Sequence, residues 1–456
     1  MLKTGFLKTT VAAAAVSMLM APAAWSQSLT DTLIAAYRNS GLLEQNRAVL
    51  RAADEDVAQA VADLRPVIDW AASLDYRDPA TAGEFVSSSV GISASLLLFD
   101  FGRSQLAIDA AKESVLSVRE TLKAVEQDVL LRGVAAFFNL RRENATVELR
   151  ENNVRLISEQ LQASRDRFEV GEVTRTDVSI AEARLASAQS GLVAAQGAAA
   201  RAVEEYRAAT GTTPTALQNP PSAPATAGSL AEAKSIAAQR HPDILGAQRD
   251  VAASELGILI AAGALRPRVT GSAGFDVNDD GNEISSVGVR VTGPIYRGGQ
   301  IASLTREAQA NRDASRAALI TTQRNIDQEV GDAWANLNVA VASRRASEEE
   351  VRAADLALRG AREEFAVGAR TTLDVLDLEQ DLLDAETNLI TADIDRNIAV
   401  YDLLSSMGLL SVEHLELGIA TYDPAAYFNA VENAPTTFVS PQGEKLDRVL
   451  RGLNRN

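Results

Sequence analysis

The sequence is an internal duplication, and this constrains the fold more than any other feature of the chain. Leu64-Arg65-Pro66 recurs as Leu265-Arg266-Pro267, and Phe168-Glu169-Val170-Gly171 recurs as Phe365-Ala366-Val367-Gly368. The offset between matching residues is 201 near the start of each copy and 197 near its end. Because tandem copies of one unit fold alike, we predict two equivalent repeats rather than the three separate domains that a length of 456 residues suggests at ~150 residues each.

The repeats are predicted to span residues 27–219 and 220–417, followed by a C-terminal tail over residues 418–456 with little periodicity. Residues 1–26 are typical of a secretory signal peptide, with two lysines, an uncharged apolar run and then small residues. The apolar run is shorter than the ~20 residues that a membrane-spanning helix needs. We therefore expect the chain to be exported.

Each repeat has the same order of predicted elements. One helix begins at a capping serine, Ser28 or Ser229, and ends at an Arg-Pro pair, because proline cannot donate the next helical hydrogen bond. Strict alternation of apolar and polar residues then predicts a strand hairpin over residues 67–98 and another over residues 268–292. Each hairpin has one apolar and one polar face.

Long helices are predicted after the hairpins, over residues 103–167 and 300–364, with apolar residues at heptad spacing. At ~1.5 Å per residue each would be on the order of 95 Å long. A tip with a Val-Gly break follows, over residues 168–177 or 365–377, and a shorter helix completes the repeat. The first and last helices together match the long one in length, so we expect them to lie end to end along it.

The four strands have the length that an outer-membrane barrel requires, ~9–11 residues each. Four strands cannot close a barrel, and an open edge in lipid would leave backbone groups unpaired. The strands therefore predict an oligomer, with eight strands as a dimer or twelve as a trimer. The alternative is a soluble four-stranded sheet packed on a helix bundle.

Composition argues against several other classes of function. The chain has 61 acidic and 44 basic residues and a net charge of -17, which argues against nucleic acid as a partner. It has no cysteine and only two histidines, His241 and His414, which we expect at the surface without a metal cluster around them. We also find no phosphate-binding loop or nucleophile motif. We predict no enzyme, no cofactor and no metal.

The repeats resemble the TolC-type outer-membrane efflux and secretion channels over residues 28–417. The features that carry the resemblance are the strand-to-helix junctions and the tips: Leu98–Arg103, Pro294–Gly299, Val170–Val178 and Val367–Asp377. The resemblance implies a mainly α fold with membrane β-structure. In it, a homotrimer combines a twelve-stranded barrel in the lipid of a Gram-negative outer membrane with a long α-helical barrel in the periplasm.

The function that this resemblance implies is a passive exit duct for type I protein secretion, multidrug efflux or both. A periplasmic adaptor (membrane fusion protein) and an inner-membrane transporter of the ABC or RND type would be its partners. The alternative from another class is a soluble periplasmic coiled-coil adaptor or scaffold. Such adaptors have one helical hairpin, whereas this chain has two, each preceded by a strand pair.

The tips have a local and a functional interpretation. The spacings Thr174-x-x-Asp177 and Thr371-x-x-Asp374 predict capping boxes, and a glycine in each tip predicts a left-handed cap. Asp377 lies too deep in its helix to cap it. By resemblance, the contact with the adaptor is made by Val170, Gly171, Val367 and Gly368.

The resemblance also implies a periplasmic gate. Asp374 and Asp377 match acids that line the lumen, where threefold symmetry would form carboxylate rings that favour cations. Links between neighbouring tips would involve Thr176, Asp177, Phe365 and Arg370. We expect Arg370 to pair with Asp177, whereas Phe365 stands where the family has a tyrosine and lacks the hydroxyl that bonds across.

Overall fold

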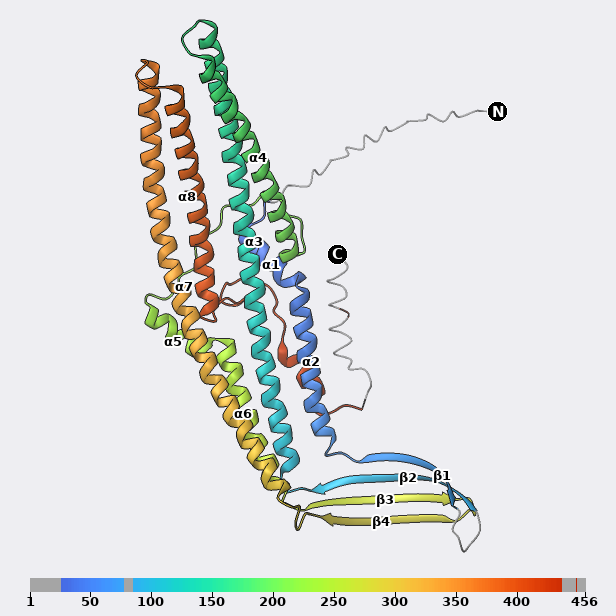
Figure 1. The fold of residues 1–456 in the computed structure, drawn as a ribbon. Coiled ribbons are helices and arrows are strands. Elements are labelled where there is room, and N and C mark those ends of the chain that lie inside the picture. Colours follow the sequence, from blue (N-terminus) through green and yellow to red (C-terminus); the bar gives the residue numbers. More distant parts are fainter. Residues whose placement is uncertain (1–25, 78–84, 437–447, 449–456) are drawn as a thin grey trace, which may run out of the picture.

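The structure is a computed structural model that describes residues 26–77, 85–436 and 448. The predicted signal peptide therefore lies outside the described residues, apart from Ser26. The chain is elongated, with a four-stranded sheet at one end, a body of long helices and two helical hairpin tips at the other end (Figure 1). The predicted mainly α fold with one small sheet per chain is confirmed.

Both repeats contain the same six elements in the same order. The first repeat comprises α1 (Leu29–Asn39), α2 (Gly41–Ala62), β1 (Val67–Arg77), β2 (Phe85–Phe99), α3 (Arg103–Glu169) and α4 (Arg175–Thr210). The second comprises α5 (Leu230–Arg240), α6 (Pro242–Gly263), β3 (Arg268–Asn278), β4 (Glu283–Thr292), α7 (Gln300–Ala366) and α8 (Thr372–Ser406). In the tail, α9 (Pro424–Val431) packs on α2.

The prediction of a single helix before each strand hairpin is wrong, because two helices occupy that segment in each repeat. Ser40 has an extended backbone between α1 and α2, and its hydroxyl accepts a hydrogen bond from the Leu43 N–H at 3.2 Å. His241 occupies the matching place between α5 and α6, where Pro242 begins the new helix. Each break starts a second helix with its own cap, so α2 and α6 can change direction at the middle of the molecule.

The surface location predicted for His241 is also wrong, since the residue is only 8 % exposed. Its Nδ1 accepts a hydrogen bond from the Asp243 N–H at 3.3 Å and so caps α6. Burial lowers the pKa of this imidazole, against the opposing effect of nearby Asp243 and Asp128. His414 is exposed, as predicted.

The strands form one antiparallel sheet in the order β1-β2-β3-β4, with β1 and β4 at its edges. Trp70, Ile92 and Phe275 pair across three strands and share an exposed apolar face. On the opposite face the hydroxyls of Ser73 and Ser89 lie 2.9 Å apart. The predicted alternation of apolar and polar faces is therefore present, and the apolar face has no covering layer in the described part of one chain.

The core of the helical body lies at the middle of α3. Phe137 and Phe138 are fully buried there, and the Phe138 ring lies 6.2 Å from the ring of Tyr401 on α8. Helix α3 packs against α2, α4, α6 and α8, so it runs through the centre of the body (Figure 1). None of the helices described here is both long enough and apolar enough to cross a membrane.

Candidate gate at the helical tips

Capping boxes start both descending helices at the tips, as predicted. The Thr174 N–H donates to an Asp177 carboxylate oxygen at 2.8 Å, and the Thr371 N–H donates to Asp374 at 3.0 Å. The reciprocal bonds, from each aspartate N–H to the threonine hydroxyl, measure 3.3 and 3.2 Å. Hydrogen bonds from Thr371 hold the pKa of Asp374 below its usual value, so this carboxylate is ionised at neutral pH.

The turns themselves have the predicted left-handed glycines. Gly171 and Gly368 both have φ of 79°, a conformation that costs a residue with a Cβ ~1–2 kcal/mol. The preceding residues, Val170 and Val367, are 72 % and 81 % exposed. Each tip therefore presents an apolar side chain to its surroundings.

Matching ion pairs join the two arms of each hairpin below its tip. Arg165 of α3 contacts Glu182 of α4 at 2.7 Å, and Arg362 of α7 contacts Glu379 of α8 at 2.9 Å. These four residues lie at equivalent positions of the two repeats. The sequence prediction missed them, although an arginine and a glutamate at the same spacing in both copies are a visible signal.

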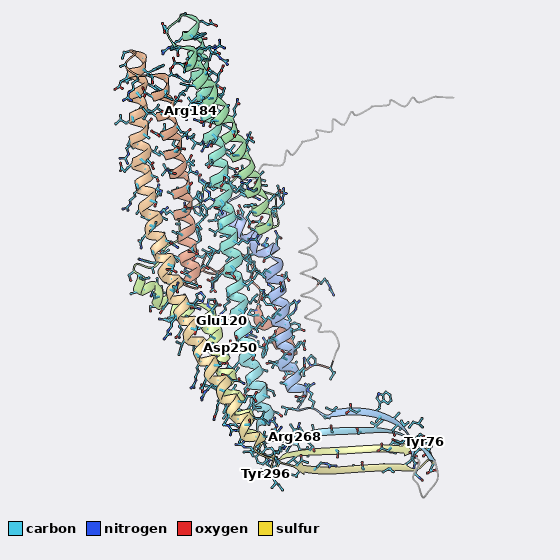
Figure 2. All side chains as sticks on the ribbon, viewed as in Figure 1. Tyr76, Glu120, Arg184, Asp250, Arg268 and Tyr296 are labelled. Carbon is cyan, nitrogen blue, oxygen red and sulfur yellow. The ribbon has the colours of Figure 1, made fainter. Side chains whose placement is uncertain are left out.

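Two further contacts connect the first hairpin to the second. Arg184 on α4 forms an ion pair with Asp377 on α8, and Figure 2 shows Arg184 close below the tips. The Arg167 guanidinium lies over the Phe365 ring, 4.6 Å from its centroid. The two tips of one chain are thus held together by two arginines of the first repeat.

An apolar cluster supports these contacts. Leu376 of α8 is buried against three residues of the first hairpin, Ile157, Leu161 and Ala181. Helix α8 therefore packs on the first hairpin at the residue that immediately precedes Asp377. This packing positions Asp377 against Arg184.

The predicted gate residues have different neighbours in the single chain. Asp377 contacts Arg184, and the Nε of Arg370 donates to Glu364 at 2.7 Å. Asp177 caps its own helix, so the expected pair between Arg370 and Asp177 stays a prediction for neighbouring chains. Thr176 is exposed at the start of α4.

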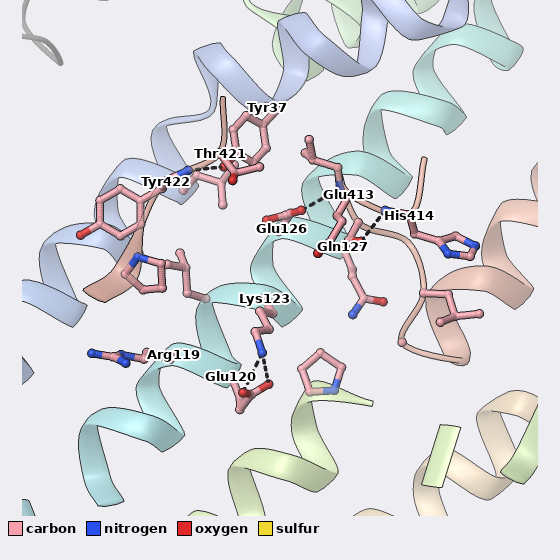
Figure 3. Close-up of a pocket in the computed structure, with 18 of the residues that line it drawn as sticks. Tyr37, Arg119, Glu120, Lys123, Glu126, Gln127, Glu413, His414, Thr421 and Tyr422 are labelled. Carbon is pink, nitrogen blue, oxygen red and sulfur yellow. Dashed lines mark hydrogen bonds and ion pairs between the residues drawn. The ribbon is translucent and has the colours of Figure 1, made fainter. Parts of the chain in front are cut away.

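A cavity of about 1060 Å³ lies far from the tips, between α2, α3 and the tail (Figure 3). Arg47 stacks between the rings of Tyr37 and Tyr422, 5.2 Å from each centroid. Glu126 accepts a hydrogen bond from the Val412 N–H at 2.8 Å, and burial raises the pKa of its carboxyl. The contact of Arg47 with Tyr422 fastens the tail to the helical body, and the bond of Glu126 to Val412 fastens the segment that leads into it.

The sequence model of one family matches both repeats, over residues 34–212 and 234–409, and its description is "Outer membrane efflux protein". The chain belongs to the outer membrane efflux protein family. This membership confirms the resemblance inferred from the junctions and tips. It also favours an outer-membrane export protein over the soluble adaptor that was the alternative.

Individual relatives are similar along nearly their whole length. The outer membrane efflux protein BepC of Brucella suis is 34 % identical over 436 residues, which cover 94 % of this chain and 95 % of BepC. The outer membrane protein TolC of Vibrio cholerae is 26 % identical over 408 residues, covering 86 % of this chain and 93 % of TolC. The Campylobacter jejuni CmeC outer membrane channel has the same fold, with a TM-score of 0.74, 17 % identity and 90 % coverage of both chains.

Proposed function

We propose that three copies of this chain form a passive duct, with a twelve-stranded barrel in the outer membrane and a helical barrel in the periplasm. The observation that carries this proposal is the sheet, which has an exposed apolar face and two open edges, β1 and β4. In lipid those edges require a partner, and pairing β4 of one copy with β1 of the next closes the sheet. Three copies supply twelve strands.

The duct contributes no catalytic step in this proposal. A periplasmic adaptor and an inner-membrane ABC or RND-type transporter supply the substrate and the energy. Efflux is the activity in the name of BepC, so the first cargo to test is drugs. Proteins of type I secretion are the second. A strain without the gene, compared with its parent for drug sensitivity and for secreted proteins, distinguishes the two.

The first prediction concerns assembly. Purified outer membranes are expected to contain the full-length chain as a trimer that runs at the monomer position only after heating, because closed barrels unfold reluctantly. Gel electrophoresis of heated and unheated samples measures this. Recovery of the chain from the soluble periplasmic fraction would overturn the channel and support the scaffold.

We further propose that the tips are the gate. The contacts of Arg184 with Asp377 and of Arg167 with Phe365 hold the two hairpins of one chain together. Across the threefold axis, Asp374 would form a ring of ionised carboxylates, while Asp377 is neutralised by Arg184. Contacts with the next copy would involve Thr176, which is exposed, and also Asp177 and Arg370, which within one chain cap α4 and pair with Glu364.

The second prediction concerns the adaptor. Val170, Gly171, Val367 and Gly368 form the ends of the tips, and their exposed valines suit an apolar contact. Since the chain has no cysteine, Val367→Cys introduces a unique thiol. A photoactivatable cross-linker on this thiol is expected to capture a periplasmic protein in intact cells, whereas the same label on Val193→Cys, an exposed valine of α4, is expected to capture none.

A further inference from the structure

Arginines gather where the sheet meets the helices, although the chain as a whole is acidic. At least one lies at the helix-side end of every strand: Arg65 before β1, Arg103 after β2, Arg266 just before β3, Arg268 at the start of β3, and Arg297 after β4. All five are exposed. We name these five residues the arginine collar.

Three members of the collar have unused donors. The Arg266 guanidinium donates to the Phe101 carbonyl at 3.0 Å, and Arg65 donates to the carbonyls of Asn433 and Ala434. Among the described residues, no hydrogen bond or ion pair holds the side chain of Arg103, Arg268 or Arg297. Arg268 lies in the field of Asp100, whose carboxylate is occupied by the N–H groups of Gly102 and Ser104 at 3.1 and 2.7 Å.

The collar borders the apolar face of the sheet. Ile295 and Tyr296, beside Arg297, are almost fully exposed, and so is Val287 of β4. Val289 and Val291 of the same strand are 68 % and 65 % exposed. Figure 2 places Arg268 and Tyr296 at the helix end of the sheet and Tyr76 at the opposite end. Tyrosines at both ends of an apolar band mark the two interfaces of a membrane.

The opposite end of the β3–β4 hairpin carries the other sign of charge. Asp279, Asp280 and Glu283 surround the turn between β3 and β4. The β3–β4 hairpin is therefore basic on its helix side and acidic at its turn. An anionic ligand is therefore attracted to the helix-side border of the apolar band rather than to the turn.

We propose that the arginine collar binds the phosphate groups of anionic phospholipids in the membrane leaflet on the helix side of the sheet. Guanidinium groups donate two parallel hydrogen bonds to a phosphate. Their aliphatic stems lie along the apolar band while their charged ends reach the headgroups. This proposal rests on the proposed function in requiring that the sheet spans a membrane as part of the trimer.

The test compares the full-length trimer in vesicles of phosphatidylcholine alone with the trimer in vesicles that also contain phosphatidylglycerol. The anionic lipid is expected to raise the temperature at which the trimer dissociates. The triple variant Arg103→Gln/Arg268→Gln/Arg297→Gln is expected to lose that rise. A control that removes the same charge from the helices, Arg201→Gln/Arg324→Gln/Arg345→Gln, is expected to keep it.

Other outcomes would overturn the proposal. An equal rise in the collar variant and in wild type would exclude the collar as the lipid site. A rise produced by inorganic phosphate in phosphatidylcholine vesicles would identify a free anion as the ligand instead. If the chain forms no trimer in either vesicle, the proposed function fails, whereas a trimer that is indifferent to lipid charge refutes the collar alone.

Discussion

Replacing Gly408 with alanine is expected to destabilise the folded chain by about 2–5 kcal/mol, because a Cβ at this position is both strained and overpacked. Gly408 follows α8 and has φ of 74°. A Cβ built there would lie 2.7 Å from the His241 Cα and 2.9 Å from the Arg240 carbonyl oxygen. Both are backbone atoms, so the end of α8 would have to move away from the break between α5 and α6.

Gly368→Ala is the matched control for this prediction. Gly368 has φ of 79°, but a Cβ there would meet nothing within 4 Å. The control should therefore show only the conformational cost of ~1–2 kcal/mol. Denaturant titration of the purified chain, with trimer content measured on the same samples, gives both values. Equal costs for the two variants would show that the contact with Arg240 and His241 is unimportant.

The contact of Gly408 with Arg240 and His241 lies at the break that the sequence analysis did not predict. Gly211 ends α4 with φ of 70°, and a Cβ there would lie 2.9 Å from the Asn39 side chain, beside the break at Ser40. In each repeat, the end of the last helix thus contacts the break between the first two helices. Local pattern predicted the strands and the long helices to within a few residues. The breaks carry local signals, the capping Ser40 and the helix-starting Pro242. Their packing against the end of the last helix is a contact across the repeat, which no local pattern contains.

The candidate site shows the same division between local and distant effects. The capping boxes of Asp177 and Asp374 need only residues three positions apart, so spacing predicted them. Arg184 and Asp377 are 193 residues apart, and the position that matches Arg184 in the second repeat is the acidic Asp381. The duplication therefore gave no indication of this pair. Nor did it indicate that Phe365, which lacks a hydroxyl, would lie under Arg167.

The charge reversal Arg184→Asp is expected to open the proposed gate. It places two carboxylates where the structure has an ion pair. The two side chains are 38 % and 52 % exposed, so each lost pair is worth only ~0.2–1 kcal/mol. A trimer loses three pairs and gains three repulsions. A total of about 1.4 kcal/mol raises the open population roughly tenfold.

The measurements are single-channel conductance in planar bilayers and the vancomycin sensitivity of cells that carry the variant. Arg201→Asp makes the same charge change farther from the tip on α4, away from Asp377, and is expected to behave as wild type. The swap Arg184→Asp/Asp377→Arg restores opposite charges at one position and is expected to restore the closed state. The swap also places a positive charge at position 377. It therefore separates two roles of Asp377, the ion pair that closes the gate and the carboxylate ring that favours cations. If closure returns while cation selectivity stays as in wild type, Asp377 acts in the ion pair that holds the gate closed, and the cation selectivity comes from Asp374. If the swap conducts like the single reversal, the contact between α4 and α8 does not hold the gate.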